Sequence, residues 1–170
     1  MFELFLMRHA KSSWQSDVAD DHERPLNNRG LRDAPLMGQR MVARTDIPAV
    51  IYCSSSVRGT STAMLVANEV GIAKEDVRPL SEGYTFDAEE VLQLVSQFKD
   101  TEASVMLVGH NPAFTVLANR FSQQAIANVP TCGLLKLVSS AQRWPDFKPE
   151  NTELLYFDYP KNDLVIKGSH

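Results

Sequence analysis

Residues 2–9, FELFLMRH, form the stretch of sequence that decides the fold. A mostly apolar run from Phe2 to Met7 stops abruptly at Arg8 and His9. Such a run is typical of a buried central strand. A guanidinium offers a fixed fork of donors to a phosphate, and a neutral imidazole beside it can be a nucleophile. The stretch therefore predicts a central strand that ends at an anion-binding site.

Strand-like and helix-like segments alternate along the chain, which favours a three-layer α/β/α sandwich with a mainly parallel sheet. The predicted strands cover residues 3–7, 49–53, 104–108, 133–138 and 153–159. Four helices are also predicted. The first has apolar residues at helical spacing, at Leu31, Ala34, Met37 and Met41, and the second ends near Val70. The third covers residues 87–98, and the fourth begins after residue 111. The loop between the last two strands, which contains Trp144, is expected at the surface.

Several residues predict where the helices begin and end. Pro35 falls inside the first helix and should kink or shorten it. Ser54, Ser55 and Ser56 are possible N-caps of the second helix, and Gly71 is placed to stop it. Asp87 to Glu90 resembles a capping box at the start of the third helix. Asn111 and Pro112 suit the N-cap and first turn of the fourth helix.

Length and composition exclude several classes of protein. The chain has 170 residues, 44% of them hydrophobic, and a formal net charge of -4. These values predict one folded domain over 1–166, without a membrane span or a nucleic-acid partner, and a cytoplasmic protein. Cys53 and Cys132 have no paired spacing, so we expect two core residues. Residues 167–170, KGSH, resemble a tag remnant. No feature predicts an oligomeric state.

Three predicted strand ends carry side chains suited to bind an anion. Arg8 and His9 end the first strand, Arg58 lies in the first helical turn after the second, and His110 follows the strand 104–108. Singly, each has an ordinary structural explanation. Together they predict one phosphate-sized site, because ligands of open α/β sheets bind at the carboxyl ends of strands. Neighbouring strand residues point to opposite faces, so Arg8 and His9 can share this site only if the strand bends or ends there.

Four segments, in this order, resemble the sequence blocks of the histidine phosphatase superfamily, which has the phosphoglycerate-mutase-like fold. They are MRHAKSSW (7–14), RPLNNRG (24–30), CSSSVRGTSTA (53–63) and VGHNP (108–112). The first is similar to the version in small bacterial phosphohistidine phosphatases of the SixA type. The chain differs from the family pattern at Ala10, where glycine is usual, at Gly59, where alanine is common, and in a serine that replaces the proline of a Ser-Ser-Pro block. None of these changes removes a charged group.

The resemblance implies a metal-independent reaction through a phosphohistidine. His9 would attack phosphorus, and water would then release phosphate. Arg8, Arg58 and His110 would hold the equatorial oxygens, where charge must be stabilised. The resemblance implies no cofactor, because fixed cations take the place of a metal.

Two further residues have more than one interpretation. Glu82 is the best candidate to protonate a leaving alkoxide, or else it is a solvated loop carboxylate. Arg24 binds the phosphate or a phosphopeptide, or else it pairs with an acidic residue at position 20, 21 or 23. Lys11 and Trp14 are expected at the rim of the pocket.

Three functions remain open on the sequence. The first is a phosphatase that acts on phosphohistidine or another phosphoprotein, since no long inserted segment closes the site. The second is a small-molecule phosphomonoesterase, with phosphoglycerate mutase less favoured. The third is a non-catalytic phosphate-binding module, although binding alone would not need two histidines. A metal hydrolase is disfavoured because the sequence has no His-x-His or carboxylate-rich spacing.

Overall fold

The computed structural model describes residues 1–14 and 20–162, and the predicted tag remnant lies outside them. Within this part of the chain, six strands form one sheet in the order β3-β2-β4-β1-β5-β6. The strands are β1 (Phe2–Arg8), β2 (Val50–Ser54), β3 (Val77–Leu80), β4 (Ser104–Gly109), β5 (Leu134–Ser139) and β6 (Thr152–Asp158). The first four are parallel, and β5 runs antiparallel to both β1 and β6.

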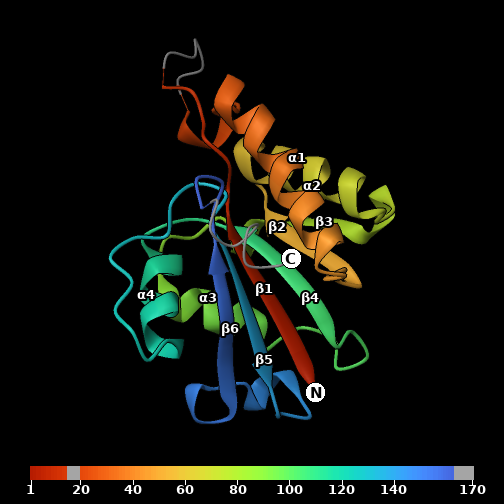
Figure 1. Cartoon of the computed structure of the whole chain (residues 1–170), viewed down its shortest axis with the longest axis vertical. Helices are drawn as coiled ribbons and strands as arrows, with labels where there is room; N and C mark the ends of the chain where they lie inside the picture. The colour runs from red at the N-terminus through yellow and green to blue at the C-terminus, as the bar shows by residue number, and fades with distance from the viewer. Residues whose placement is uncertain (15–19, 163–170) are drawn as a thin grey trace.

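Helices cover both faces of this sheet, as Figure 1 shows. One face carries α1 (Asn28–Ala43) and α2 (Val57–Val70), and the other carries α3 (Ala88–Val95) and α4 (Ala113–Phe121). The predicted α/β/α sandwich with a mainly parallel sheet is therefore confirmed. The mixed character of the sheet comes from β5, which pairs beside β1.

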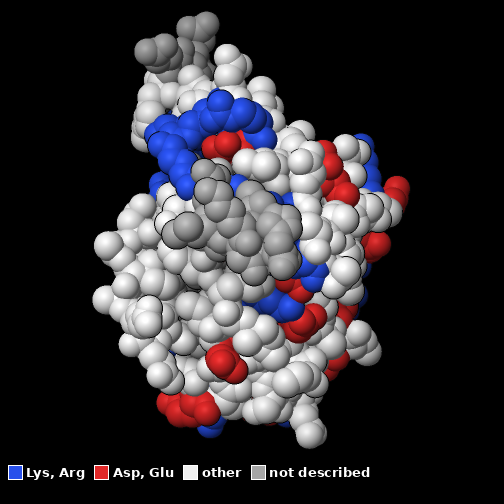
Figure 2. All heavy atoms as spheres, viewed as in Figure 1, with Lys and Arg blue, Asp and Glu red and all other residues white. Residues whose placement is uncertain are grey.

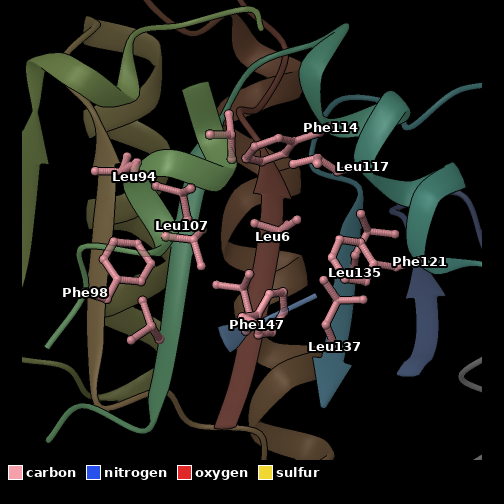
Figure 3. Close-up of a cluster of buried hydrophobic side chains, with 14 of the residues drawn as sticks. Leu6, Leu94, Phe98, Leu107, Phe114, Leu117, Phe121, Leu135, Leu137 and Phe147 are labelled. Atoms are coloured by element: carbon pink, nitrogen blue, oxygen red, sulfur yellow. The ribbon is translucent and has the colours of Figure 1, made fainter. Parts of the chain in front are cut away.

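The apolar run that opens the chain builds two cores because side chains alternate across a strand. Leu4 and Leu6 point into the core beneath α3 and α4, and Phe5 and Met7 point into the core beneath α1 and α2. Figure 3 shows the first of these cores, where Leu6 and Leu107 face Phe114 and Leu117 of α4. The strand is buried on both sides, which explains its nearly continuous hydrophobicity.

The helix ends predicted for α2 and for the start of α3 are confirmed. Ser56 caps α2 by accepting a hydrogen bond from the backbone N–H of Gly59, and Gly71 ends it in a left-handed conformation with φ 79°. The carboxylate of Asp87 accepts a hydrogen bond from the N–H of Glu90 at the start of α3. These contacts satisfy backbone donors that have no partner within the first helical turn.

The start of α4 and the course of α1 differ from expectation. Pro112, not Asn111, is the N-cap of α4, and the Asn111 side chain instead accepts a hydrogen bond from the N–H of Thr115. Helix α1 continues through Pro35 to Ala43, so the proline does not shorten it. Leu31, expected on the apolar face of α1, is half exposed, because the buried face of the helix runs through Gly30 and Ala34 instead.

Two further expectations about the sheet and its loops need correction. Strand β3 was not predicted, because its Arg78 and Pro79 break the apolar pattern; both are tolerated at the edge of the sheet. Trp144 is not at the surface: it is 1% exposed and stacks on Phe2 with ring centroids 4.5 Å apart. Its indole N–H donates to the carbonyl oxygens of Lys99 and Glu102, which makes its burial possible.

Candidate active site

The carboxyl ends of β1, β2 and β4 meet at one edge of the sheet, where a cavity of about 210 Å³ opens. The cavity is lined by Arg8, His9, Lys11, Ser12, Trp14, Asp21, Arg24, Arg58, Phe86, His110, Asn111 and Thr131. Figure 2 shows that basic side chains gather at the end of the molecule toward which β1 runs. The structure thus brings together the four residues of the predicted phosphate site, with Arg24, Lys11 and Trp14 around them.

His9 and Arg8 share the cavity because β1 ends between them. The strand stops at Arg8, and the backbone N–H of His9 donates to the carbonyl oxygen of Gly109 at the end of β4. Beyond the strand, alternation of side chains no longer applies, so both residues reach the same side. The strand therefore ends where the sequence analysis required it to end if Arg8 and His9 were to share one site.

The His9 ring is held in one tautomer. Its Nδ1 lies 2.7 Å from the carbonyl oxygen of Ala10, which can only accept a hydrogen bond, so Nδ1 carries the proton of the neutral ring. The unshared electron pair is then on Nε2. Burial, with a smaller effect of Arg58, Arg8 and Arg24, lowers the pKa of His9 to about 4. At neutral pH the ring is uncharged and nucleophilic.

His110 lies next to His9, with ring centroids 5.1 Å apart, and is 1% exposed. Its Nε2 is 2.7 Å from the hydroxyl of Ser54, while Nδ1 is buried and has no hydrogen-bond partner among the described residues. Burial and the nearby His9 and Arg58 lower the pKa of His110 to about 3. Two neutral histidines therefore stand side by side in a site otherwise rich in cations.

The arginines of the cavity are anchored through some of their nitrogens and leave others open. Arg8 donates through Nη1 to the carbonyl oxygen of Val129, and its Nε has no partner. Arg58 likewise has a buried Nε without a partner in the described part of the chain. With Nδ1 of His110, they are three of the six buried side-chain atoms that have no partner in the described part of the chain, and the other three belong to residues outside the cavity lining. The gathering of three such atoms around one cavity indicates a place for an external acceptor.

Among the described residues, Asp21 is the one carboxylate that lines the cavity. It accepts hydrogen bonds from Arg58 Nη2 at 2.8 Å, Arg24 Nη1 at 2.9 Å and the Tyr84 hydroxyl at 2.6 Å. The hydrogen bond from Tyr84, followed by those from Arg58 and Arg24, lowers the pKa of Asp21 far below its usual value. Asp21 thus remains an anion that orients two guanidinium groups.

Arg24 forms the ion pair that one interpretation of the sequence expects, and it also lies at the cavity. It pairs with Asp21, and it also lines the cavity, with its guanidinium carbon 3.3 Å from the ring centroid of Trp14. Nη2 of Arg24 donates to the Ser12 hydroxyl, and Nε donates to the Ser13 carbonyl at 3.1 Å. The side chain therefore ties the loop after β1 to the segment that carries Asp21.

Backbone contacts behind the cavity explain why the sequence blocks depend on one another. The N–H of Ala10 donates to the Thr62 hydroxyl, which in turn donates to the carbonyl oxygen of Arg58. Gly30 lies against the carbonyl oxygen of Lys11, where any Cβ would collide with the backbone. The blocks that contain His9, Gly30 and Arg58 are thereby fixed against each other.

Glu82 is not brought into the cavity. It lies in a short 3-10 helix, Ser81–Gly83, is exposed, and is absent from the lining residues. Its neighbours Tyr84 and Phe86 reach the site instead, Tyr84 through Asp21 and Phe86 as part of the lining. The expectation of a proton donor at Glu82 thus has no geometric support.

Asp21, Tyr84 and Ser54 were not identified as site residues from the sequence. Asp21 was considered only as a partner of Arg24, and the segment around Tyr84 has no periodic pattern. Ser54 was noted only as a possible helix cap. The one available signal was the acidic run beside Arg24, since a buried arginine needs a counter-charge.

Other parts of the described chain offer no competing site of this kind. A larger groove of about 1210 Å³, between residues 120–128 and β6, has no histidine or cysteine in its lining. Over residues 1–14 and 20–162, no group of three or more histidine, cysteine, aspartate or glutamate side chains is arranged to hold a metal ion. Over the same residues, no helix is long and apolar enough to span a membrane.

Comparison with known proteins agrees with this geometry. The sequence profile of the histidine phosphatase superfamily (branch 1) matches residues 4–91. An uncharacterized protein of Mycobacterium leprae is 31% identical over 169 residues, covering 91% of this chain and all of that protein. The chain belongs to the histidine phosphatase superfamily.

Solved structures agree with this assignment. A protein assigned as the phosphohistidine phosphatase SixA of Agrobacterium tumefaciens superposes with a TM-score of 0.77 at 26% identity, over 94% of this chain and 98% of that one. The protein histidine phosphatase SixA complexed with tungstate has a TM-score of 0.74 at 19% identity, over 95% and 99%. This second likeness establishes the fold.

Proposed function

We propose that the protein is a metal-independent phosphatase that forms a phosphohistidine intermediate on His9 and acts on phosphohistidine or other phosphoprotein substrates. The observation that carries this proposal is the state of His9: a buried, neutral ring whose Nδ1 is bound to the Ala10 carbonyl, leaving the electron pair of Nε2 for attack. A histidine that only bound phosphate would instead need to present a proton.

In the first step, Nε2 of His9 attacks phosphorus, and the bond from phosphorus to the leaving group breaks. Arg8, Arg58 and His110 donate to the equatorial oxygens, where negative charge is concentrated in the transition state. In the second step, water attacks phosphohistidine, inorganic phosphate leaves, and His9 regains its electron pair. Arg24, stacked on Trp14, adds a further positive charge at the mouth of the cavity.

The substrate preference rests on the size of the cavity and on its described lining, whose one carboxylate, Asp21, is held as an anion by Arg58 and Arg24. A cavity of about 210 Å³ is smaller than the roughly 300–1,000 Å³ pockets that enclose drug-sized ligands, so most of a large substrate must lie outside it. This arrangement suits a phosphate carried on a protein surface. An imidazole leaving group can take a proton from water on its other nitrogen, so a phosphohistidine substrate does not need an acid at Glu82.

The second candidate function is a broad phosphomonoesterase for small molecules. It is favoured by the same small cavity, which contacts little of a substrate beyond its phosphoryl group. The two candidates differ in their need for a proton donor, since an alkoxide leaves poorly without one. A comparison of rates on a phosphohistidine protein and on a panel of alkyl and aryl phosphates will separate them.

The intermediate is tested by brief incubation with a radiolabelled phosphodonor, followed by quenching and peptide mapping. We expect an acid-labile, base-stable label on His9, and none in His9→Ala. His22→Ala is the matched control, because His22 is a partly buried histidine outside the cavity lining. A label on another residue, or turnover by His9→Ala at the wild-type rate, would overturn the mechanism.

A further inference from the structure

Ser54, the last residue of β2, lies directly behind His110. It is fully buried, its hydroxyl oxygen is 2.7 Å from Nε2 of His110, and it is not part of the cavity lining. The two nitrogens of an imidazole point in widely different directions. Nδ1, which has no partner among the described residues, is therefore turned away from Ser54. The serine thus holds Nε2 of a histidine whose buried Nδ1 has no partner in the described part of the chain.

The hydrogen bonds around Ser54 leave two possible arrangements. Its oxygen accepts from the N–H of Ser56, and the two hydroxyls lie 3.0 Å apart. The Ser56 hydroxyl also lies 3.5 Å from Nε2 of His110, at the limit of a hydrogen bond, whereas the Ser54 hydroxyl lies 2.7 Å from it and is the main partner of that nitrogen. If the Ser56 hydroxyl donates to Ser54, the Ser54 proton is free to go to Nε2. If Ser54 donates to Ser56, then Nε2 of a neutral His110 must donate to Ser54. Each arrangement fixes a different tautomer of His110.

The ligand of the cavity distinguishes the two arrangements. With the proton on Nε2, Nδ1 would turn a lone pair toward the phosphate oxygens and repel them. With Ser54 as donor, Nδ1 carries the proton and can donate to an oxygen. The Ser56 oxygen already accepts from the N–H of Gly59 as the cap of α2, so its own proton is available to Ser54.

We infer that Ser54 is a positioning residue: it donates its hydroxyl proton to Nε2 of His110 and so holds Nδ1–H toward the phosphate. This inference rests on the proposed function, because it takes an oxyanion as the ligand. His110 then acts as a neutral hydrogen-bond donor. The lowered pKa of His110 supports this role, since a ring that is neutral at pH 7 has a single proton to place.

The tautomer can be read directly from the folded wild-type protein. We expect ¹⁵N NMR of protein labelled at its histidine side chains to show His110 protonated on Nδ1 and unprotonated on Nε2, with and without vanadate. Assignment is made by comparison with His110→Ala. A proton on Nε2, or a doubly protonated ring at neutral pH, would overturn the inference without reference to any activity.

The role of Ser54 is tested with Ser54→Ala. We expect the ring to lose its preference for Nδ1–H and the inhibition constant for vanadate to rise about tenfold, the typical effect of one lost buried hydrogen bond. Ser139→Ala removes another fully buried hydroxyl, on β5 and far from the cavity, and should leave both readouts unchanged. A wild-type tautomer and vanadate affinity in Ser54→Ala would contradict the inference.

These readouts separate the inference from the proposed function. If His9 never becomes labelled but His110 shows the Nδ1–H tautomer and its dependence on Ser54, the phosphatase mechanism fails and the positioning role stands. If His9 is labelled but His110 carries its proton on Nε2, the mechanism stands and the positioning role fails.

Discussion

His9 and His110 occupy matching places at the ends of two adjacent parallel strands, β1 and β4, yet different ring nitrogens are engaged in each. In His9, Nδ1 is bound and Nε2 is open; in His110, Nε2 is bound and Nδ1 is open. Both rings are buried, and burial lowers the pKa of both. Strand position and charge therefore do not distinguish their roles.

The chemistry of the partner distinguishes them. A backbone carbonyl, as at His9, can only accept, so the ring must donate there and keep its electron pair on the other side. A serine hydroxyl, as at His110, can donate or accept, so it can leave a proton on the open nitrogen. One pair of identical residues can thereby supply an attacking group and a binding group.

Removing each histidine gives the largest expected effects. His9→Ala should abolish the phosphoenzyme and lower kcat by about 10⁴-fold or more, as loss of a nucleophile does. His110→Ala should lower kcat by about 10²–10³-fold, the typical effect of losing one donor to the developing charge, while His9 is still labelled. Single-turnover labelling with steady-state kinetics measures both. A label that appears on His110 in His9→Ala, with turnover, would reverse the roles.

Loss of the carboxylate beside the histidines should have an intermediate effect. Asp21→Ala removes acceptors from Arg58 and Arg24 and should lower kcat/KM by about tenfold, because the guanidinium groups are no longer held in place. Asp20→Ala is the matched control, since the Asp20 carboxylate accepts from the backbone N–H of His22 and does not line the cavity. Tighter binding of vanadate with unchanged kcat in Asp21→Ala would show that Asp21 competes with the anion instead.

The two buried rings should also make the fold sensitive to acid. Histidines in the unfolded chain take up protons near pH 6.5, whereas His9 does so at about 4 and His110 at about 3 in the folded protein. The unfolded state binds more protons in this window, so the free energy of unfolding falls as the pH drops below 6.5. The slope approaches about 1.4 kcal/mol per pH unit for each histidine.

Chemical denaturation between pH 4 and pH 7.5 measures this dependence, and NMR titration assigns it to each ring. His9→Ala and His110→Ala should each reduce the slope. A slope that both variants leave unchanged would mean that the rings take up protons normally in the folded protein.

Glu82→Gln should have the smallest effect, within about twofold on kcat for a phosphohistidine substrate, because the side chain lies outside the cavity. Glu89→Gln, an exposed glutamate on α3, is the control. The rates on alkyl phosphates provide the sharper measurement. A large loss on alkyl phosphates alone would restore Glu82 as a proton donor reached through movement of its segment.

The layers, the buried strands and most helix ends could be predicted because they depend on local patterns. A nearly continuous apolar run predicted β1, Ser56 and Asp87 marked helix starts by the hydrogen bonds that their side chains accept, and Gly71 marked a helix end by its left-handed conformation. The burial of Trp144 could not be predicted, because it depends on Phe2 and two carbonyl groups more than 40 residues away. Strand β3 could not be predicted for a similar reason, because its Pro79 is tolerated only at the edge of the sheet, and local sequence does not show that β3 lies there.

The residues of the site also separate into those that could be predicted from local sequence and those that could not. Arg8, His9, Arg58 and His110 could be predicted because each follows a recognisable strand end in a recognisable motif. Asp21, Tyr84 and Ser54 act through contacts across 37 to 63 positions of sequence, which no local pattern reveals. Glu82 illustrates the converse: its position between two motifs suggests a role, and its exposed side chain does not line the cavity.

The contact between Arg24 and Trp14 gives the protein a built-in optical reporter. The chain contains two tryptophans, and they are in opposite environments: Trp14 is 76% exposed at the rim of the cavity, and Trp144 is 1% exposed in the core. A water-soluble quencher such as acrylamide reaches the first and spares the second. Because Trp14 lines the cavity and lies against the Arg24 guanidinium, the quenchable part of the emission comes from the tryptophan at the site, and an anion that enters the cavity can be followed by it without a label.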